Sequence, residues 1–248
     1  MKKLYLFIII AVLAIACSSD SQESTSNSPG TDGQGGSTAI FALKGDYLYT
    51  VDHRNLNVFS LLSATGPVQV NTVQIAFDIE TLFADGDMLY VGSQSGMYMY
   101  SITNPEDPEM LAAVSHFTAC DPVVANGTHA YVTLHTNTWC GNNNNALMVY
   151  DITDVNSPLL VHQRGLVSPK GLGLYGNYLL VCDDVIKIFD ITNAEEPVLA
   201  TTINKQCNDI IIRGDELYAV GDYGVYNYTL NSASISQYAL NSEVSFAQ

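Results

Sequence analysis

One short pattern recurs along this chain of 248 residues, and it constrains the fold more than any other feature. A glycine stands just before an apolar, strand-like stretch in KGDYLYTV, DGDMLYVG, NGTHAYVT, YGNYLLVC and RGDELYAV. The spacings between these glycines are 41, 41, 49 and 38 residues, for Gly45, Gly86, Gly127, Gly176 and Gly214. A nearly constant period of this length indicates one structural unit that is repeated five times.

A second pattern recurs near the end of the units, in MYSITNPEDPEML, MVYDITDVNSPLLV and IFDITNAEEPVL. We expect the Thr and the Asn or Asp side chains to set a turn by hydrogen bonding to the local backbone. The proline four residues after the Asn or Asp suits the start of an outer strand, where a missing N–H is tolerated. Asp151 and Asp190 are therefore interpreted as structural rather than as repeated acidic ligands, and the second unit has Ser101 at their position.

Each unit contains four candidate strands. In the second unit these are residues 79–84, 88–93, 97–102 and 109–117, separated by Asp-Gly, Ser-Gly and Asn-Pro turn signals. Four short strands in about 41 residues are typical of a β-propeller blade. The sequence thus predicts an all-β chain, with a five-bladed β-propeller of four-stranded antiparallel blades over residues 38–248. Residues 244–247 are predicted to pair with the first blade as a closing strand.

These units resemble the LVIVD repeat family. The residues that carry the resemblance are MLYVGSQSGMYMYSITNPEDP and YLLVCDDVIKIFDITNAEEP, and it covers nearly all of residues 39–240. The first unit, LNVFSLLSATGP, and the last, VYNYTLNSAS, depart most from the pattern. The resemblance implies a β-propeller on an exported or surface protein of bacteria. It implies no activity, because the family is defined by its repeat and not by a shared reaction.

The chain begins MKKLYLFIIIAVLAIAC, in which two lysines precede an apolar run over residues 4–16. This run is shorter than the roughly 20 residues of a membrane-spanning helix, and it is typical of a secretory signal peptide. The ending AIAC resembles the lipobox of bacterial lipoproteins, with Ala14 where Leu is usual. We therefore expect a signal peptide over residues 1–16 and a lipid on Cys17, the alternative being an ordinary cleaved signal.

Residues 17–37 continue from the lipidated cysteine as a Ser/Gly/Asp-rich segment that cannot bury apolar surface, so a disordered tether is expected. Ser18 after the cysteine favours passage to the outer membrane in such lipoproteins. We expect an outer-membrane, lipid-anchored and surface-exposed protein, or otherwise a periplasmic one. Its contact with the membrane is then made only through the anchor, and the folded part is expected to be a monomer.

The formal net charge of −16 argues against nucleic acid as a partner, because binding to phosphates requires Lys and Arg. No phosphate-binding loop, dinucleotide fingerprint or zinc-protease motif is present in the sequence. The classes left to consider are binding modules, hydrolases and structural subunits of a larger envelope assembly.

One residue stands six positions before each repeat glycine, where the inner strand of a blade begins. If the units superpose, these residues form a ring near one mouth of the channel: Ala39, Glu80, Asp121, Lys170 and Asn208. The ring is interpreted either as lining a water-filled channel or as a site for a small polar or cationic ligand. Ca²⁺ prefers several oxygen ligands, but Lys170 in the same ring argues against a dedicated cation site. No other cofactor is expected.

Glu80 and Asp121 form the sharper hypothesis. Two carboxyl groups at the mouth are the pair that glycoside hydrolysis needs as general acid and base. Under this alternative the protein is a carbohydrate-active hydrolase, although we find fewer aromatic platforms than such enzymes usually bring and no third carboxylate.

Four cysteines remain after Cys17, an even number in an oxidising compartment. We favour a disulfide between Cys120 and Cys140, and expect a second one, Cys182–Cys207, to join adjacent blades. The alternative is a zinc site, because His116-x₃-Cys120 and His135-x₄-Cys140 have ligand-like spacing.

The insertion HTNTWCGNNNN (135–145) departs most from the repeat and carries the only tryptophan, Trp139. Loops on a rigid scaffold often carry function, so Trp139 is either a contact for a partner or a residue packed over a disulfide-linked loop. The sequence therefore predicts a non-enzymatic binding or interaction module for a protein or glycan. Its recognition face is the one with the cysteines, the ring and this loop.

Overall fold

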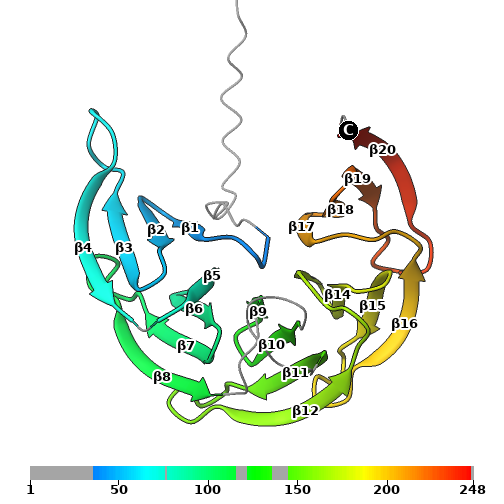
Figure 1. Cartoon of the computed structure of the whole chain (residues 1–248), viewed down its shortest axis with the longest axis horizontal. Helices are drawn as coiled ribbons and strands as arrows, with labels where there is room; N and C mark the ends of the chain where they lie inside the picture. The colour runs from blue at the N-terminus through cyan, green and yellow to red at the C-terminus, as the bar shows by residue number, and fades with distance from the viewer. Residues whose placement is uncertain (1–35, 76, 116–121, 136–144, 247–248) are drawn as a thin grey trace, which may run out of the picture. The chain divides into compact units, whose positions relative to one another are not determined.

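The computed structural model describes residues 36–75, 77–115, 122–135 and 145–246. These residues belong to one compact unit, residues 32–248. They form twenty β-strands and no helix, so no described segment is a helix of the length and apolar character needed to cross a membrane. The strands make five four-stranded antiparallel sheets, which are the five blades of a β-propeller (Figure 1). The predicted fold class is confirmed.

The strands run from the innermost to the outermost within each blade. Blade 1 contains β1 (Phe41–Lys44), β2 (Tyr47–Val51), β3 (Asn55–Ser60) and β4 (Val68–Gln74). Blade 2 contains β5 (Ile79–Asp85), β6 (Met88–Ser93), β7 (Gly96–Ser101) and β8 (Glu109–Ser115). Blade 3 contains β9 (Val123–Ala125), β10 (His129–Leu134), β11 (Ala146–Asp151) and β12 (Leu159–Gly165). Blade 4 contains β13 (Leu172–Tyr175), β14 (Tyr178–Cys182), β15 (Ile186–Asp190) and β16 (Val198–Ile203). Blade 5 contains β17 (Asp209–Arg213), β18 (Glu216–Gly221), β19 (Gly224–Thr229) and β20 (Ala239–Ser245).

The repeat glycines are required by the hairpin between the first two strands of each blade. All five have a positive φ, between 54° and 80°, in the region that L-residues with a side chain rarely adopt. In blade 1 the turn has two residues, because Lys44 pairs with Tyr47. A glycine at the first position of such a turn lets the strands keep their natural twist.

The turn motif after the third strand of a blade is also structural. A carboxylate oxygen of Asp151 accepts a hydrogen bond of 2.8 Å from the backbone N–H of Thr153, and Asp190 does the same for Thr192 at 2.8 Å. The hydrogen bonds from Thr153 hold the pKa of Asp151 below its ordinary value. The prolines that follow directly precede the outer strands, as predicted: Pro67, Pro108, Pro158 and Pro197.

The hydrophobic core lies between neighbouring blades. We call the face of a blade that packs on the next blade in the sequence its forward face, and the opposite one its backward face. Each of the four core clusters joins the forward face of one blade to the backward face of the next. The tyrosines of the repeat contribute to three of the forward faces: Tyr49, Tyr90 and Tyr131.

The predicted closing strand is wrong. Val244 lies in β20 and pairs with Val225 of β19, so this segment is the outermost strand of blade 5 and not an addition to blade 1. The physical reason is that β19 needs a neighbour for its outward backbone groups. Residues 239–245 are the next extended segment of the chain, after the turns at residues 231–238.

Candidate functional site

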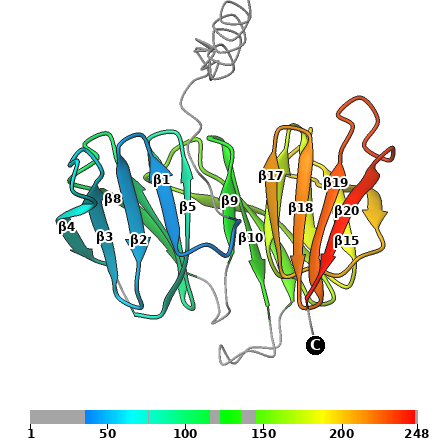
Figure 2. The ribbon, with the colours of Figure 1, turned by 90° about the horizontal axis from the view of Figure 1, so that it is seen from above.

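The loops that join the second and third strands of each blade lie at the same end of the propeller as the loops that join one blade to the next. This follows from the antiparallel order of the strands, which run between the two ends (Figure 2). We call this end the mouth. Glu80, Lys170 and Asn208 all lie at the mouth, in or just before the inner strands of their blades. Asp121 lies outside the described residues.

A hollow of about 220 Å³ opens at the mouth between blades 4 and 5. We call it the mouth hollow. Its lining is mostly polar and comes from four loops, and it includes Ser168, Lys170, Asp183, Asn208, Asp222 and Tyr223. Polar groups that converge on a hollow are what fixes the orientation of a small ligand.

Lys170 and Asn208, two of the predicted ring residues, lie side by side in the mouth hollow. The Lys170 ammonium donates a hydrogen bond of 2.6 Å to the side-chain oxygen of Asn208. The amide nitrogen of Asn208 donates in turn to a carboxylate oxygen of Asp222, at 2.5 Å. The result is a chain of ammonium, amide and carboxylate whose members orient one another, with both donors and acceptors near the hollow.

The backbone holds these side chains in place. The N–H of Lys170 donates to the carbonyl of Cys182 at 2.7 Å, and the N–H of Gly171 donates to the carbonyl of Asn208 at 2.9 Å. Gly171 allows this close approach, because a Cβ there would lie 2.8 Å from that carbonyl oxygen and 2.7 Å from the Cα of Asp209. The entry loops of blades 4 and 5 are therefore joined directly at the hollow.

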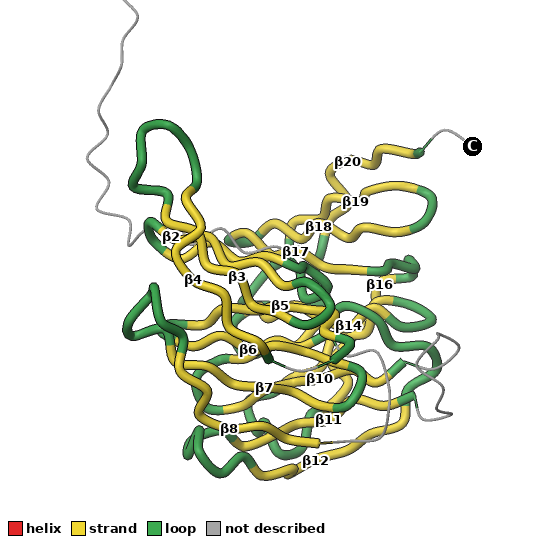
Figure 3. The backbone as a smooth tube through the Cα atoms, turned by 60° about the vertical axis from the view of Figure 1, so that its left-hand side comes forward, coloured by secondary structure: helices red, strands yellow, loops and turns green. Residues whose placement is uncertain are grey.

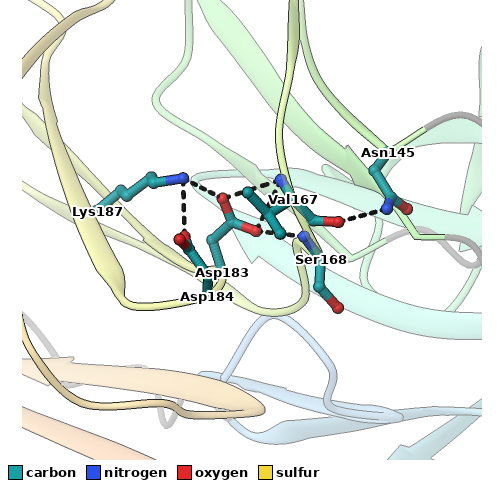
Figure 4. A network of polar contacts seen from close by, with 6 residues as sticks. All are labelled: Asn145, Val167, Ser168, Asp183, Asp184 and Lys187. Atoms are coloured by element: carbon teal, nitrogen blue, oxygen red, sulfur yellow. Dashed lines mark hydrogen bonds and ion pairs between the residues drawn. The ribbon is translucent and has the colours of Figure 1, made fainter.

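A buried carboxylate organises the loop that enters blade 4 (Figure 4). The Asp183 side chain is fully buried and accepts hydrogen bonds from the backbone N–H groups of Val167, at 3.1 Å, and Ser168. The Lys187 ammonium pairs with Asp183 and, at 2.9 Å, with Asp184. Burial alone would lower the pKa of Lys187, but the hydrogen bonds to these two carboxylates outweigh it and the pKa is raised.

A disulfide joins Cys182, at the end of β14, to Cys207, just before β17. The predicted pairing of these two cysteines is confirmed. The bond links blade 4 to blade 5 at the edge of the mouth hollow, which Cys207 lines. The other predicted disulfide, Cys120–Cys140, lies outside the described residues, as do His116 of the zinc alternative and Trp139.

His135 lies close to the same network. Its buried Nδ1 has no hydrogen-bond partner among the described residues. Burial and then the Lys170 ammonium lower the pKa of His135, and the Asp183 carboxylate opposes them more weakly. The imidazole is therefore neutral at pH 7. Across the described part of the chain, no group of three or more His, Cys, Asp or Glu side chains is arranged to hold a metal ion.

Glu80 lies in a different hollow, of about 540 Å³, between blades 1 and 2. Asp52, His53, Asp78 and Gln94 also line it. Gln94 donates a hydrogen bond of 3.1 Å to Glu80. Burial raises the pKa of Glu80, and the bond from Gln94 offsets part of this effect. The structure therefore brings together Lys170 and Asn208 but places Glu80 in a separate hollow.

The inner strands enclose a cavity that a residue of the N-terminal segment also lines. Side chains of the inner strands line a small cavity of about 110 Å³, among them Phe83, Val124 and Leu172. Ser37 is buried there, and its hydroxyl accepts a hydrogen bond of 2.7 Å from the N–H of Leu172 and donates one of 3.1 Å to Asp209. Burial raises the pKa of Asp209. The segment predicted to end the tether thus enters the channel.

Sequence reasoning missed the part that Asp183 and Lys187 play, although the repeat contains the signal for Asp183. The residue seven positions after the glycine is Asp52 in blade 1 and Ser93 in blade 2, and Asp183 holds this place in blade 4. Asp52 and Ser93 also accept hydrogen bonds from nearby backbone N–H groups. A comparison of the repeats at this position would have identified a turn-forming acceptor at the mouth.

No family model matches this chain, and no curated protein matches it in sequence. It is similar in structure to a protein from Lactobacillus plantarum (TM-score 0.64, 14% identity), covering 80% of this chain and 67% of that one. It is also similar to the periplasmic gluconolactonase PpgL of Pseudomonas aeruginosa (TM-score 0.61, 14% identity), with coverages of 81% and 67%. The computationally designed protein Ika8 matches with a TM-score of 0.59 and 12% identity, over 82% of this chain and 60% of its own. At these identities the likeness shows the fold alone.

Proposed function

We propose that the protein is a non-enzymatic binding module of the cell surface that takes a glycan at the mouth hollow. It is proposed to be a lipoprotein of the LVIVD repeat type, a monomer held at the outer membrane by a lipid on Cys17. The observation that carries the binding proposal is the ordered chain from Lys170 through Asn208 to Asp222 in a hollow of about 220 Å³.

The chemistry of the mouth hollow suits a polyhydroxylated ring. A sugar offers many hydroxyl groups that both donate and accept, and the hollow presents an ammonium, an amide and carboxylates at fixed positions. Tyr223, at 67% exposed, stands at the rim with its ring free to stack on an apolar sugar face. The disulfide and the Asp183 network hold the surrounding loops in place, so little order has to be gained on binding.

Screening of the purified protein against a glycan array, followed by calorimetric titration of the best ligand, tests this proposal. Lys170→Met removes the ammonium that orients Asn208 and is expected to weaken binding at least tenfold, or about 1.4 kcal/mol. The matched control is Lys44→Met, at the opposite end of the propeller, which leaves the affinity unchanged. The proposal is contradicted if no glycan binds, or if both variants lose the same affinity. A protein that is captured by the wild type and not by Lys170→Met would show that the ligand is a protein.

No metal requirement is proposed, and Ca²⁺ provides the check. Binding is expected to be the same with EDTA and with added Ca²⁺. Affinity that is lost on chelation and restored by Ca²⁺ places a cation in the site instead.

A second candidate function has one observation in its favour. Burial raises the pKa of Glu80 in its hollow, and a general acid must stay protonated to work. Under this alternative Glu80 and Asp121 are the acid and base of a carbohydrate-active hydrolase. The wild-type protein and the variants Glu80→Gln and Asp121→Asn are assayed on a panel of glycans and lactones. Turnover by the wild type that both variants lose supports the hydrolase, and no turnover by the wild type excludes a hydrolase of the compounds tested.

The anchor is tested separately from the site. Replacement of Cys17 by Ser is expected to release the protein from the membrane fraction, while protease treatment of intact cells is expected to digest the wild-type protein at the surface. If the variant without Cys17 stays bound to the membrane, the proposed anchor is wrong. If the wild-type protein is protected from the protease, the proposed surface exposure is wrong.

A further inference from the structure

Within the part of the chain that the structure describes, blades 1 and 5 each have one face against which no sheet packs. Four core clusters join consecutive blades, but among the described residues none joins blade 5 to blade 1. Figures 1 and 3 show these two blades standing apart at the ends of the row. Near the axis, hydrogen bonds of the N-terminal segment link the two sides, from the hydroxyls of Ser37 at 3.1 Å and Thr38 at 2.6 Å to Asp209.

The burial of the middle strands shows the same difference. In β6 and β10 every residue after the first is buried, because these strands have a blade on each side. In β3 and β18 only alternate residues are buried. Successive side chains of a strand point to opposite faces, so alternation means that one face is covered and the other is not.

The free forward face of blade 5 is built from the residue types that are buried elsewhere. Tyr218 stands four residues after its glycine, and it is partly exposed. The residues at this position in the other blades are at most 1% exposed: Tyr49, Tyr90, Tyr131 and Leu180. Val225, also partly exposed, corresponds to four residues that are fully buried: Leu56, Met97, Leu147 and Ile186.

The free backward face of blade 1 shows the same pattern. Phe59 is the aromatic residue near the end of a third strand, and it is partly exposed. The residues at its position in the other blades are at most 4% exposed: Tyr100, Tyr150, Phe189 and Tyr228. Phe59 lies next to Leu48, which pairs with Leu43, so an apolar row crosses three strands of this face. Phe41, at 43% exposed, lies on the same face.

The two free faces are therefore the two halves of the interface that recurs four times inside the molecule. A surface that fits the forward face of blade 5 has the chemistry of a backward face. A surface that fits the backward face of blade 1 has the chemistry of a forward face. We propose that these faces form an acceptor site for further propeller blades, four-stranded antiparallel sheets supplied by a second polypeptide. The site is separate from the mouth hollow and does not depend on the proposed glycan binding.

Polar residues at the centres of the free faces favour a separable partner over permanent closure of the ring on itself. Asn227 stands where the other blades have fully buried apolar residues: Val58, Met99, Val149 and Ile188. Thr50 likewise stands where the others have Val91, Val132, Val181 and Ala219. The Asn227 amide donates to Glu216 at 2.8 Å and accepts from Asn241 at 2.8 Å. These bonds suit a face that meets water part of the time, as non-obligate interfaces do.

The size of the partner follows from the structural neighbours. The five blades of this chain match 67% of the length of the Lactobacillus plantarum protein and of the Pseudomonas aeruginosa gluconolactonase. A third of each neighbour lies beyond the matched part, and a segment of that length is long enough for about two further blades. A wedge of two blades presents one backward face and one forward face, as the acceptor site requires.

The test adds blades to the full chain. A second copy of residues 77–166, which contain blades 2 and 3, is fused after Gln248 through a flexible Gly/Ser linker. Hydrogen exchange is then compared between the fused and the parental protein. We expect amide exchange in β3 and β18 to slow by at least about tenfold in the fusion, towards the rates of β6 and β10. No slowing in either strand overturns the proposal.

Tyr218→Glu separates the acceptor site from general effects on folding. In the fusion, this substitution is expected to remove the added protection from exchange. In the parental chain, it is expected to shift the urea midpoint no more than the control Leu199→Glu does, since Leu199 is an exposed residue of β16. Two results in the parental chain overturn the proposal. In the first, amide exchange in β3 and β18 is already as slow as in β6, which would mean that the ring has closed on itself. In the second, light scattering shows a dimer that Tyr218→Glu dissociates, which would mean that a second copy of the chain occupies the free faces.

Discussion

The disulfide between Cys182 and Cys207 is expected to contribute a large part of the stability at the mouth. Its cysteines are 25 residues apart in sequence. In the chain-entropy model a bond that closes a loop of this length stabilises the folded state by about 3.5 kcal/mol at 25 °C, through the unfolded chain it restricts. The double variant Cys182→Ala, Cys207→Ala is therefore expected to lose about that much free energy of unfolding, measured by urea denaturation without reductant.

The same variant tests the reasoning about the mouth hollow. The bond ties the start of blade 5, with Asn208, to the end of β14 in blade 4, so its loss is expected to weaken ligand binding as well as stability. Peptide mapping without reduction should recover the Cys182–Cys207 pair and the predicted Cys120–Cys140 pair. A loss of stability below about 1 kcal/mol, or free thiols at positions 182 and 207, would refute the argument.

Three further perturbations have defined outcomes. Gly96→Ala places a Cβ 2.0 Å from a backbone carbonyl of β8 and should lower the free energy of unfolding by about 2 kcal/mol or more, while Gly165→Ala, with open space, should not. Backbone and side-chain hydrogen bonds lower the pKa of Asp52 to about 2. Its stabilising contribution is therefore present at neutral pH and is lost as the pH falls from about 4 through about 2. An NMR titration midpoint near the ordinary carboxyl value would contradict this. Asp183→Ala leaves Lys187 without its buried partner and should cost about 3 kcal/mol, measured by urea denaturation against the exposed control Asp184→Ala, which should cost under about 1 kcal/mol.

The sequence was sufficient for the blade count and topology because the repeat residues have local physical reasons. Gly45 and its equivalents stand where the hairpin requires a positive φ, and Asp151 and its equivalents accept hydrogen bonds two residues on. The Cys182–Cys207 bond was also predictable, since one cysteine ends a second strand and the other precedes the next inner strand.

The candidate site was predictable only in part. Lys170 and Asn208 meet because the entry loops of two consecutive blades hydrogen bond to each other, which the repeat suggests. Glu80 lies in another hollow, because ring residues of non-consecutive blades are separated by the channel. The contact of Ser37 with Asp209 spans 172 residues of sequence, and no local pattern signals it.

The pairing of residues 244–247 with the first blade was predicted wrongly for a related reason. Their composition fits any exposed edge strand, and only the pairing with β19 decides where they belong. By contrast, the polar Asn227 and Thr50 at otherwise apolar repeat positions are visible in the sequence, and comparison of the units would have indicated the free faces.

The most direct test of the central claim is a map of amide chemical-shift changes on titration with the glycan that binds best. The account predicts that the largest changes gather at the mouth hollow, at Ser168, Lys170, Asn208, Asp222 and Tyr223, and that they vanish in Lys170→Met. Changes confined to the hollow around Glu80 or to the opposite end of the propeller would contradict it.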